Sequence, residues 1–141
     1  MLDIESLAVD PVAAEEGTWA SYLGAKFLIA RHNSDKATFL RSKLTLERWD
    51  EITGEDAEVA GEAARQINAK VMAEAVLLDW EGVTKDGGEI TYTPEVGYQY
   101  LVDPRFRDLV QYIENFSLNR ANYRERVEAE VAESVKDSAA S

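Results

Sequence analysis

The feature that most constrains the fold is an alanine-rich apolar stripe in the middle of the chain. A helix is predicted to begin at Thr53, with Asp56 as its capping partner, and to end at the Asp79–Gly82 turn. Apolar residues recur along this segment at spacings of three and four: Ala60, Ala63, Ile67, Val71, Ala75 and Leu78. This spacing is that of one face of a helix. Because so many of these residues are alanine, a second helix can approach closely.

Two segments have the pattern of β-hairpins. Aromatic and β-branched residues bounded by glycines occupy 17–31, with Gly24 in the middle. The segment 83–92 places Asp86-Gly87 between two β-prone runs, which indicates a tight turn. Each segment therefore predicts a small antiparallel hairpin.

Further helices are predicted on both sides of the second hairpin. Asn33 and Ser34 supply an N-cap for a helix over about 35–49, with core candidates Phe39, Leu40, Leu44 and Leu46. Helix starts are predicted at Pro94 and Pro104, each after a capping residue. Beyond Pro104 the stripe of Phe106, Leu109, Val110, Ile113 and Phe116 continues through Tyr123, Val127, Val131 and Val135. It predicts either one long helix or two helices joined near Ser117.

These elements predict an α+β fold, mostly helical, in one domain with two small β-hairpins. A chain of 141 residues is within the usual size of a single domain. Residues 1–16 carry five acidic and no basic side chains and are expected to form an extended arm with at most a weak helical turn. The domain proper is expected at 17–135. The small polar segment 136–141 is expected to be a flexible tail whose removal does not harm folding.

The charge disfavours two classes of partner. Fifteen basic and twenty-seven acidic side chains give a formal net charge of -12, which repels phosphate backbones and anionic lipid. We therefore expect neither a nucleic-acid partner nor a membrane partner. The start of the chain lacks a signal peptide, and no apolar run reaches the roughly 18 residues of a membrane helix, so a cytoplasmic protein is expected. The segment 26–48 is an exception in charge, with six basic and two acidic residues and a local balance of +4.

The sequence carries no signature of catalysis. It has no cysteine and one histidine, His32, which we interpret as a polar residue beside a turn. Nucleotide loops, the serine elbow and the zinc helix motif are absent. We expect no catalytic residue, no cofactor, no metal site and no enzyme activity. Six aromatic residues beside polar turns or on apolar stripes remain as candidates for interaction: Trp49, Trp80, Tyr98, Tyr100, Phe106 and Tyr112.

Several stretches together resemble a known family. They read AVLLDWEGVT at 75–84, DGGEITYTPE at 86–95 and LVDPRFRDL at 101–109, followed by Asn122-Tyr123. In the first part of the chain, Asp10-Pro11, EEGTW at 15–19 and AKFLIARHN at 25–33 belong to the same pattern. In their order and spacing, over most of residues 8–125, they resemble the tail assembly chaperones of long-tailed, siphovirus-like bacteriophages. The acidic, glycine-containing segment 50–62 departs from the family pattern.

The resemblance implies a role in assembly without catalysis. Such proteins bind the tape measure protein, keep its long apolar helices soluble and help to recruit tail tube subunits around it. It implies a location in the host cell cytoplasm during assembly and absence from the mature virion; self-association is left open. Two other hypotheses remain: a structural head–tail or tail-completion protein that is present in the virion, and an acidic host-directed regulator that mimics nucleic acid. The basic segment 26–48 argues against the second of these.

Overall fold

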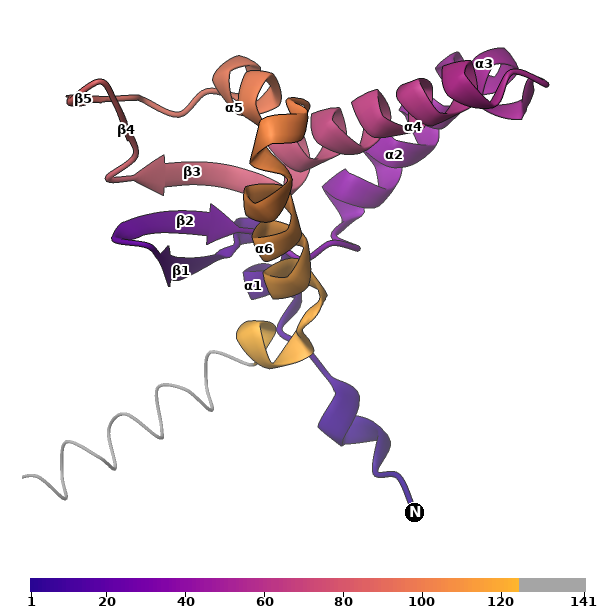
Figure 1. Cartoon of the computed structure of the whole chain (residues 1–141). Helices are drawn as coiled ribbons and strands as arrows, with labels where there is room; N and C mark the ends of the chain where they lie inside the picture. Colours follow the sequence, from indigo (N-terminus) through magenta and orange to yellow (C-terminus); the bar gives the residue numbers. More distant parts are fainter. Residues whose placement is uncertain (125–141) are drawn as a thin grey trace, which may run out of the picture.

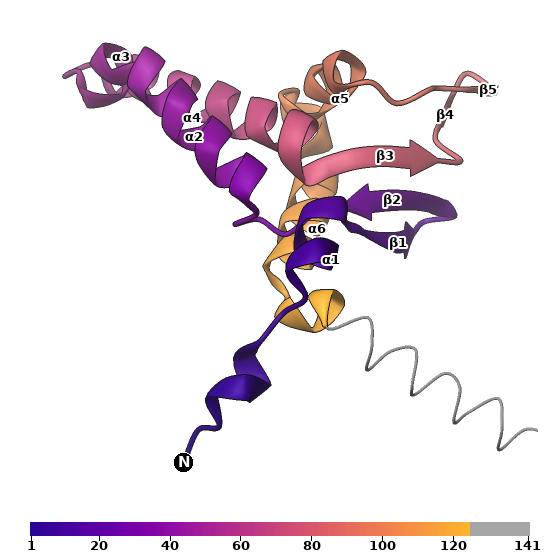
Figure 2. The ribbon, with the colours of Figure 1, turned by 180° about the vertical axis from the view of Figure 1, so that it is seen from behind.

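The computed structural model describes residues 1–124 (Figure 1). A three-stranded antiparallel sheet has the order β1 (Thr18–Tyr22), β2 (Ala25–Ile29) and β3 (Leu77–Glu81). Helix α6 (Arg107–Leu118) packs across the sheet, while α2 (Asp35–Glu47), α3 (Trp49–Thr53) and α4 (Ala57–Val71) extend away from it to one side (Figures 1 and 2). Helices and small antiparallel sheets thus form an α+β fold that is mostly helical, as the sequence predicts.

The predicted hairpin at 17–31 is confirmed as β1 and β2. Leu23 and Gly24 form its turn with φ values of 50° and 85°, which suits a two-residue turn that matches the twist of the strands. Ala20 pairs with Phe27 across the hairpin, and both side chains are buried. The alternation of buried and open positions places one face of the hairpin in the core.

The central helix differs from its prediction at both ends. The expected start at Thr53 is wrong, because α3 ends there and Asp56 caps α4 by accepting hydrogen bonds from the backbone N–H groups of Glu58 and Val59. The expected continuation through Leu78 is also wrong. A π-helical turn at Met72–Val76 ends the helix, and β3 begins at Leu77.

The edge of the first hairpin explains why 77–81 is a strand. β3 pairs antiparallel with β2, with Phe27 opposite Trp80. This pairing satisfies backbone groups of β2 that would otherwise form an open sheet edge. It also buries Leu77 completely and leaves Trp80 only 5% exposed. A short apolar run fits a helix or a strand equally well, so the available partner decides the outcome.

The predicted position of helix α2 is confirmed, but only some of its predicted core residues are buried. Ser34 caps it by accepting the backbone N–H of Ala37 at 3.1 Å. Leu44 is buried and Leu40 packs against the core. Phe39 and Leu46, however, are 73% and 72% exposed, so their assignment to the core is wrong. They lie on the exposed side of α2, away from the buried Ala37 and Leu44.

The second hairpin and the helices after it lie where the sequence predicts them. β4 (Thr84–Lys85) and β5 (Gly88–Glu89) flank Asp86 and Gly87, which both have positive φ. Thr93 caps α5 (Pro94–Leu101), and Asp103 caps the 3-10 helix Pro104–Phe106. Helix α6 ends at Leu118, and a separate 3-10 helix follows at Arg120–Tyr123. The helical segment after Pro104 is therefore interrupted close to Ser117 and is not one continuous helix. The stripe positions Val127, Val131 and Val135 and the predicted tail 136–141 lie outside the described residues.

The acidic arm is shorter than the predicted 1–16. Residues Ile4–Leu7 form a 3-10 helix with no buried residue. Residues Pro11–Glu16 form α1, whose Ala13 and Ala14 are buried. The backbone N–H of Asp10 donates to the carbonyl of Tyr123 at 2.7 Å, and that of Arg31 donates to the carbonyl of Ala14 at 2.9 Å. The arm therefore leaves the body before Asp10, not after α1.

No helix within residues 1–124 has the length and apolar character needed to cross a bilayer.

Gly97 on α5 offers a test of how closely this helix packs. A Cβ at this position would lie 2.6 Å from the hydroxyl of Tyr92, which itself hydrogen bonds to the carbonyl oxygens of Ala73 and Leu77. Gly97→Ala gains about 1 kcal/mol of helix propensity but overpacks the site at a cost of about 1–3 kcal/mol. We expect a net loss of stability in urea unfolding. Gly61→Ala on α4 is the control, since nothing lies within 4 Å of its added Cβ, and it should stabilise. Equal effects of the two substitutions would contradict close packing at Gly97.

Candidate functional site

The strongest candidate site is a hollow between the second hairpin, α5 and α6, which we call the aromatic groove. Its cavity measures about 320 Å³. It is lined by Phe27, Trp80, Val83, Thr84, Lys85, Ile90, Tyr100, Arg105, Phe106 and Leu109. Most of this lining is apolar, and its two charged residues are both basic. The volume falls at the lower end of the range for ligand pockets, enough for a few apolar side chains of a partner.

Trp80 on β3 forms the floor of the aromatic groove. It is buried, and its indole N–H donates to the carbonyl of Ile90 at 2.7 Å, so the segment after β5 is tied to the sheet. The edges of other rings surround it, with Tyr92 at 4.9 Å, Tyr100 at 6.3 Å and Phe27 at 6.4 Å between centroids. Tilted ring pairs of this kind add to the burial energy. The floor is therefore rigid, and Trp80 acts first as a core residue.

The wall opposite the hairpin is built by Tyr100 and the 3-10 helix that follows α5. The rings of Tyr100 and Phe106 lie 5.2 Å apart at 81°. The Arg105 guanidinium lies 5.3 Å from the centre of the Phe106 ring and pairs with Asp103 at 2.8 Å. Its hydrogen bonds to Asp103 hold the pKa of that carboxyl below its usual value. The wall thus presents apolar ring surface with the Arg105–Asp103 ion pair beside it.

The structure brings three of the six predicted interaction residues together in this groove: Trp80, Tyr100 and Phe106. The other three lie elsewhere. Trp49 is 52% exposed on α3. Tyr112 on α6 stacks on Tyr22 at 3.9 Å between centroids. Tyr98 lines a second hollow. The sequence did not single out Val83, Ile90 and Leu109 as interaction residues, because their position in the groove depends on how the second hairpin folds toward α6.

This second hollow lies between α2, α4 and α5, and we call it the polar pocket. Its volume is about 570 Å³. It is lined by Leu44, Glu47, Arg48, Gln66, Ile67, Lys70, Ala73, Glu74, Pro94, Glu95 and Tyr98. Three acidic and two basic side chains are among its lining residues, so it offers no single charge to a ligand.

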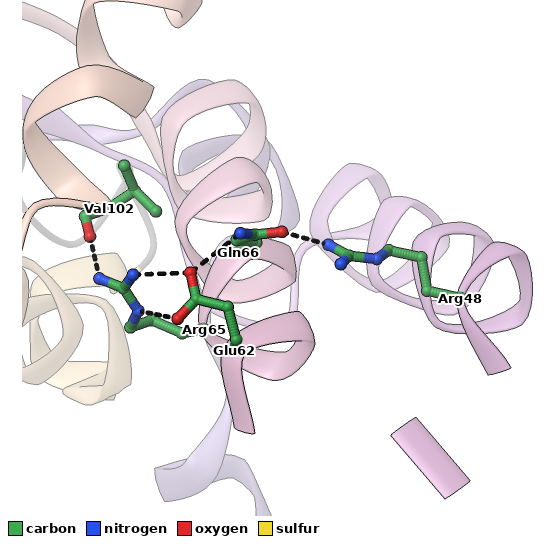
Figure 3. Close-up of polar contacts among 5 residues, drawn as sticks. All are labelled: Arg48, Glu62, Arg65, Gln66 and Val102. Atoms are coloured by element: carbon green, nitrogen blue, oxygen red, sulfur yellow. Dashed lines mark hydrogen bonds and ion pairs between the residues drawn. The ribbon is translucent and has the colours of Figure 1, made fainter. Parts of the chain in front are cut away.

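A chain of polar contacts beside the polar pocket joins the three helices (Figure 3). Arg48 donates to the amide oxygen of Gln66 at 2.6 Å, and Gln66 donates to Glu62 at 2.9 Å. Arg65 pairs with Glu62 at 2.7 Å and donates to the carbonyl of Val102. The hydrogen bond from Arg65 lowers the pKa of the Glu62 carboxyl, and the hydrogen bond from Gln66 lowers it further by a smaller amount. These partially exposed contacts position α4 between α2 and α5, which is a structural role.

His32 lies in the turn between β2 and α2, as interpreted from the sequence. Its Nδ1 is 3.3 Å from the carbonyl oxygen of Ser117. Burial lowers the pKa of the imidazole. Across residues 1–124, no three histidine or acidic side chains gather closely enough to suggest a metal ion site.

Comparison with known proteins places the chain in a family of phage origin. No curated protein and no solved structure matches it. Residues 33–134 match the sequence model of a family described as YdaY prophage protein. The match covers well over half of the chain, from α2 through α6, and includes every lining residue of the aromatic groove except Phe27. The chain therefore belongs to the YdaY prophage protein family and is a bacteriophage protein.

Proposed function

We propose that this protein is a tail assembly chaperone that binds apolar helical segments of the phage tape measure protein, keeps that protein soluble and helps to recruit tail tube subunits. The role requires no catalysis, cofactor or metal, and it places the protein in the host cytoplasm during assembly. The observation that carries the proposal is the aromatic groove on a protein of phage origin.

The shape and lining of the groove suit a helix as client. An amphipathic helix binds a groove by inserting apolar side chains at spacings of three and four. The half-buried residues Ile90, Tyr100 and Leu109 leave apolar surface for such contacts on both sides of the Trp80 floor. Lys85 favours an acidic residue on the flank of the client helix, while Arg105 is already paired with Asp103.

The charge of the whole protein supports the same role. A formal net charge of -12 keeps a complex with an aggregation-prone partner in solution. It also disfavours nucleic acid and anionic membranes as alternative partners. Charge is therefore expected to affect mainly the rate of association, while the apolar contacts determine affinity.

Co-expression with the tape measure protein of the same prophage tests the proposal. We expect a larger soluble yield of the tape measure protein and a complex that survives pull-down at about 1 M salt, because apolar contacts are not screened. Leu109→Glu replaces an apolar lining residue with a charge and should weaken binding by at least about tenfold, since the client loses apolar contact and a bound client would have to desolvate the carboxylate. Leu118→Glu is the matched control, with the same substitution nine residues later on α6 at a 48% exposed position.

Two results would overturn the proposal. One is a tape measure protein that stays insoluble on co-expression, with no complex at low or high salt. The other is detection of the protein in purified virions by mass spectrometry, which would favour a structural head–tail or tail-completion protein. Equal binding by the Leu109→Glu and Leu118→Glu variants, both folded, would remove the aromatic groove from the proposal.

A further inference from the structure

Helix α2 carries apolar residues on two opposite sides. One side packs on the core through Ala37, Leu40 and Leu44. The other side, which we call the outer face of α2, carries Lys36, Phe39, Lys43 and Leu46, all exposed. Their spacing of three, four and three residues aligns them in one row along the helix. The row combines two large apolar side chains, 73% and 72% exposed, with two positive charges, and the exposed acidic side chains of Asp35 and Glu47 flank it.

The arm before Asp10 has the complementary character. Asp3 and Glu5 are its charged side chains, and Leu2, Ile4 and Leu7 are 69%, 71% and 37% exposed. The segment is folded locally, because the side chain of Asp3 accepts the backbone N–H of Glu5 and the 3-10 helix Ile4–Leu7 follows. That helix buries none of its residues. A folded turn with exposed apolar side chains and two carboxylates is suited to an apolar surface that also presents lysines.

From this complementarity we infer that residues 1–9 of one copy dock on the outer face of α2 of a second copy. Phe39 and Leu46 would contact Ile4 and Leu7, and Lys36 and Lys43 would pair with Asp3 and Glu5. Each copy carries both an arm and an α2, so two copies that exchange their arms would make the same contact twice and close as a two-fold dimer. This contact uses neither the aromatic groove nor a client protein.

The direction of the arm favours a second copy over the chain's own α2. In Figures 1 and 2 the arm leaves the body on the side opposite the far end of α2, where Leu46 lies close to α3. The backbone N–H of Asp10 is bonded to the Tyr123 carbonyl, which fixes the starting direction of the arm. A partner copy can present its α2 to the arm without any change in this anchor.

Two copies that each carry a charge of -12 also repel each other. At about 0.15 M salt this general repulsion is screened beyond about 8 Å, whereas pairs in direct contact are screened much less. Added salt weakens both the repulsion and the attraction, so a salt titration does not separate them. Exchange of charges between the two surfaces does.

The test is sedimentation velocity of the whole chain between about 5 and 500 µM, a range that covers weak dimers. We expect the mass of the unaltered protein to rise from one chain toward two. Asp3→Asn with Glu5→Gln should raise the dimer Kd by at least tenfold, and since asparagine keeps the cap of the 3-10 helix, this loss reports the charge. Phe39→Ser should weaken the dimer similarly, while Leu118→Ser on α6 should leave it unchanged.

Charge exchange provides the decisive comparison. One variant carries Asp3→Lys and Glu5→Lys, and the other carries Lys36→Glu and Lys43→Glu. Each alone should sediment as a single chain, because arm and outer face then have the same sign. Mixed in equal amounts they should form a dimer again, since both contacts of the mixed pair become complementary. All four positions are exposed, so the variants should fold, which circular dichroism checks.

A single-chain mass of the unaltered protein at every concentration would overturn the inference, and so would a mixture of the two variants that fails to associate. Both measurements use the protein without the tape measure protein. Their outcome is therefore separate from that of the chaperone proposal.

Discussion

Replacing Trp80 with alanine is expected to lower the free energy of unfolding by about 3–5 kcal/mol, as is usual for large aromatic side chains removed from a core. Trp80 is 5% exposed and contacts the rings of Phe27, Tyr92 and Tyr100. The substitution also removes the donor to the Ile90 carbonyl and so releases the second hairpin from the sheet. Urea unfolding monitored by circular dichroism measures the change.

Two companion variants separate the contributions at Trp80. Trp80→Phe keeps most of the apolar volume but loses the hydrogen bond to Ile90, and should cost less than Trp80→Ala. Trp49→Ala removes the same side chain from a 52% exposed position and should cost less than about 1 kcal/mol. A nearly neutral Trp80→Ala with lost client binding would instead assign Trp80 to the interface.

Tyr123→Ala is expected to have an effect of similar size, about 3–5 kcal/mol. The side chain is fully buried between α6 and β2, with the Phe116 ring at 6.1 Å. Its hydroxyl donates to the carbonyl of Ile29 at 2.8 Å, across 94 positions of sequence. The same residue anchors α1, since its carbonyl accepts the backbone N–H of Asp10. Loss of the ring should therefore loosen both the end of α6 and the start of the domain.

Tyr123→Phe tests the hydroxyl alone. It should cost about 0.5–1.5 kcal/mol, the usual net value of one hydrogen bond. If Tyr123→Ala unfolds at the same urea concentration as the unaltered protein, residues 119–124 do not stabilise the core and the packing described for them is wrong. If Tyr123→Phe costs as much as Tyr123→Ala, the hydrogen bond is the main contribution and the ring is secondary.

The sequence predicts some single residues of the aromatic groove but not their arrangement. The sequence indicates Trp80, Tyr100 and Phe106 as interaction candidates, because aromatic residues beside turns are common at interfaces. Their convergence depends on β3, which pairs with a strand about 50 positions earlier. Trp49, Tyr98 and Tyr112 are interaction candidates by the same criterion but lie outside the aromatic groove. Residue type alone does not determine which helices and strands pack against each other.

Local chemistry by itself determined the turns, the caps and most of the helices. Ser34, Thr93 and Asp103 cap the elements they were expected to cap, and Asp86-Gly87 forms the expected turn. These features depend on residues close in the chain, whose preferences do not require a partner. Only the tertiary structure decided that 77–81 is a strand, because the open edge of β2 outweighs the helical spacing of the stripe. It also decided that Phe39 and Leu46 remain outside the core, because α4 can cover only one of the two apolar sides of α2.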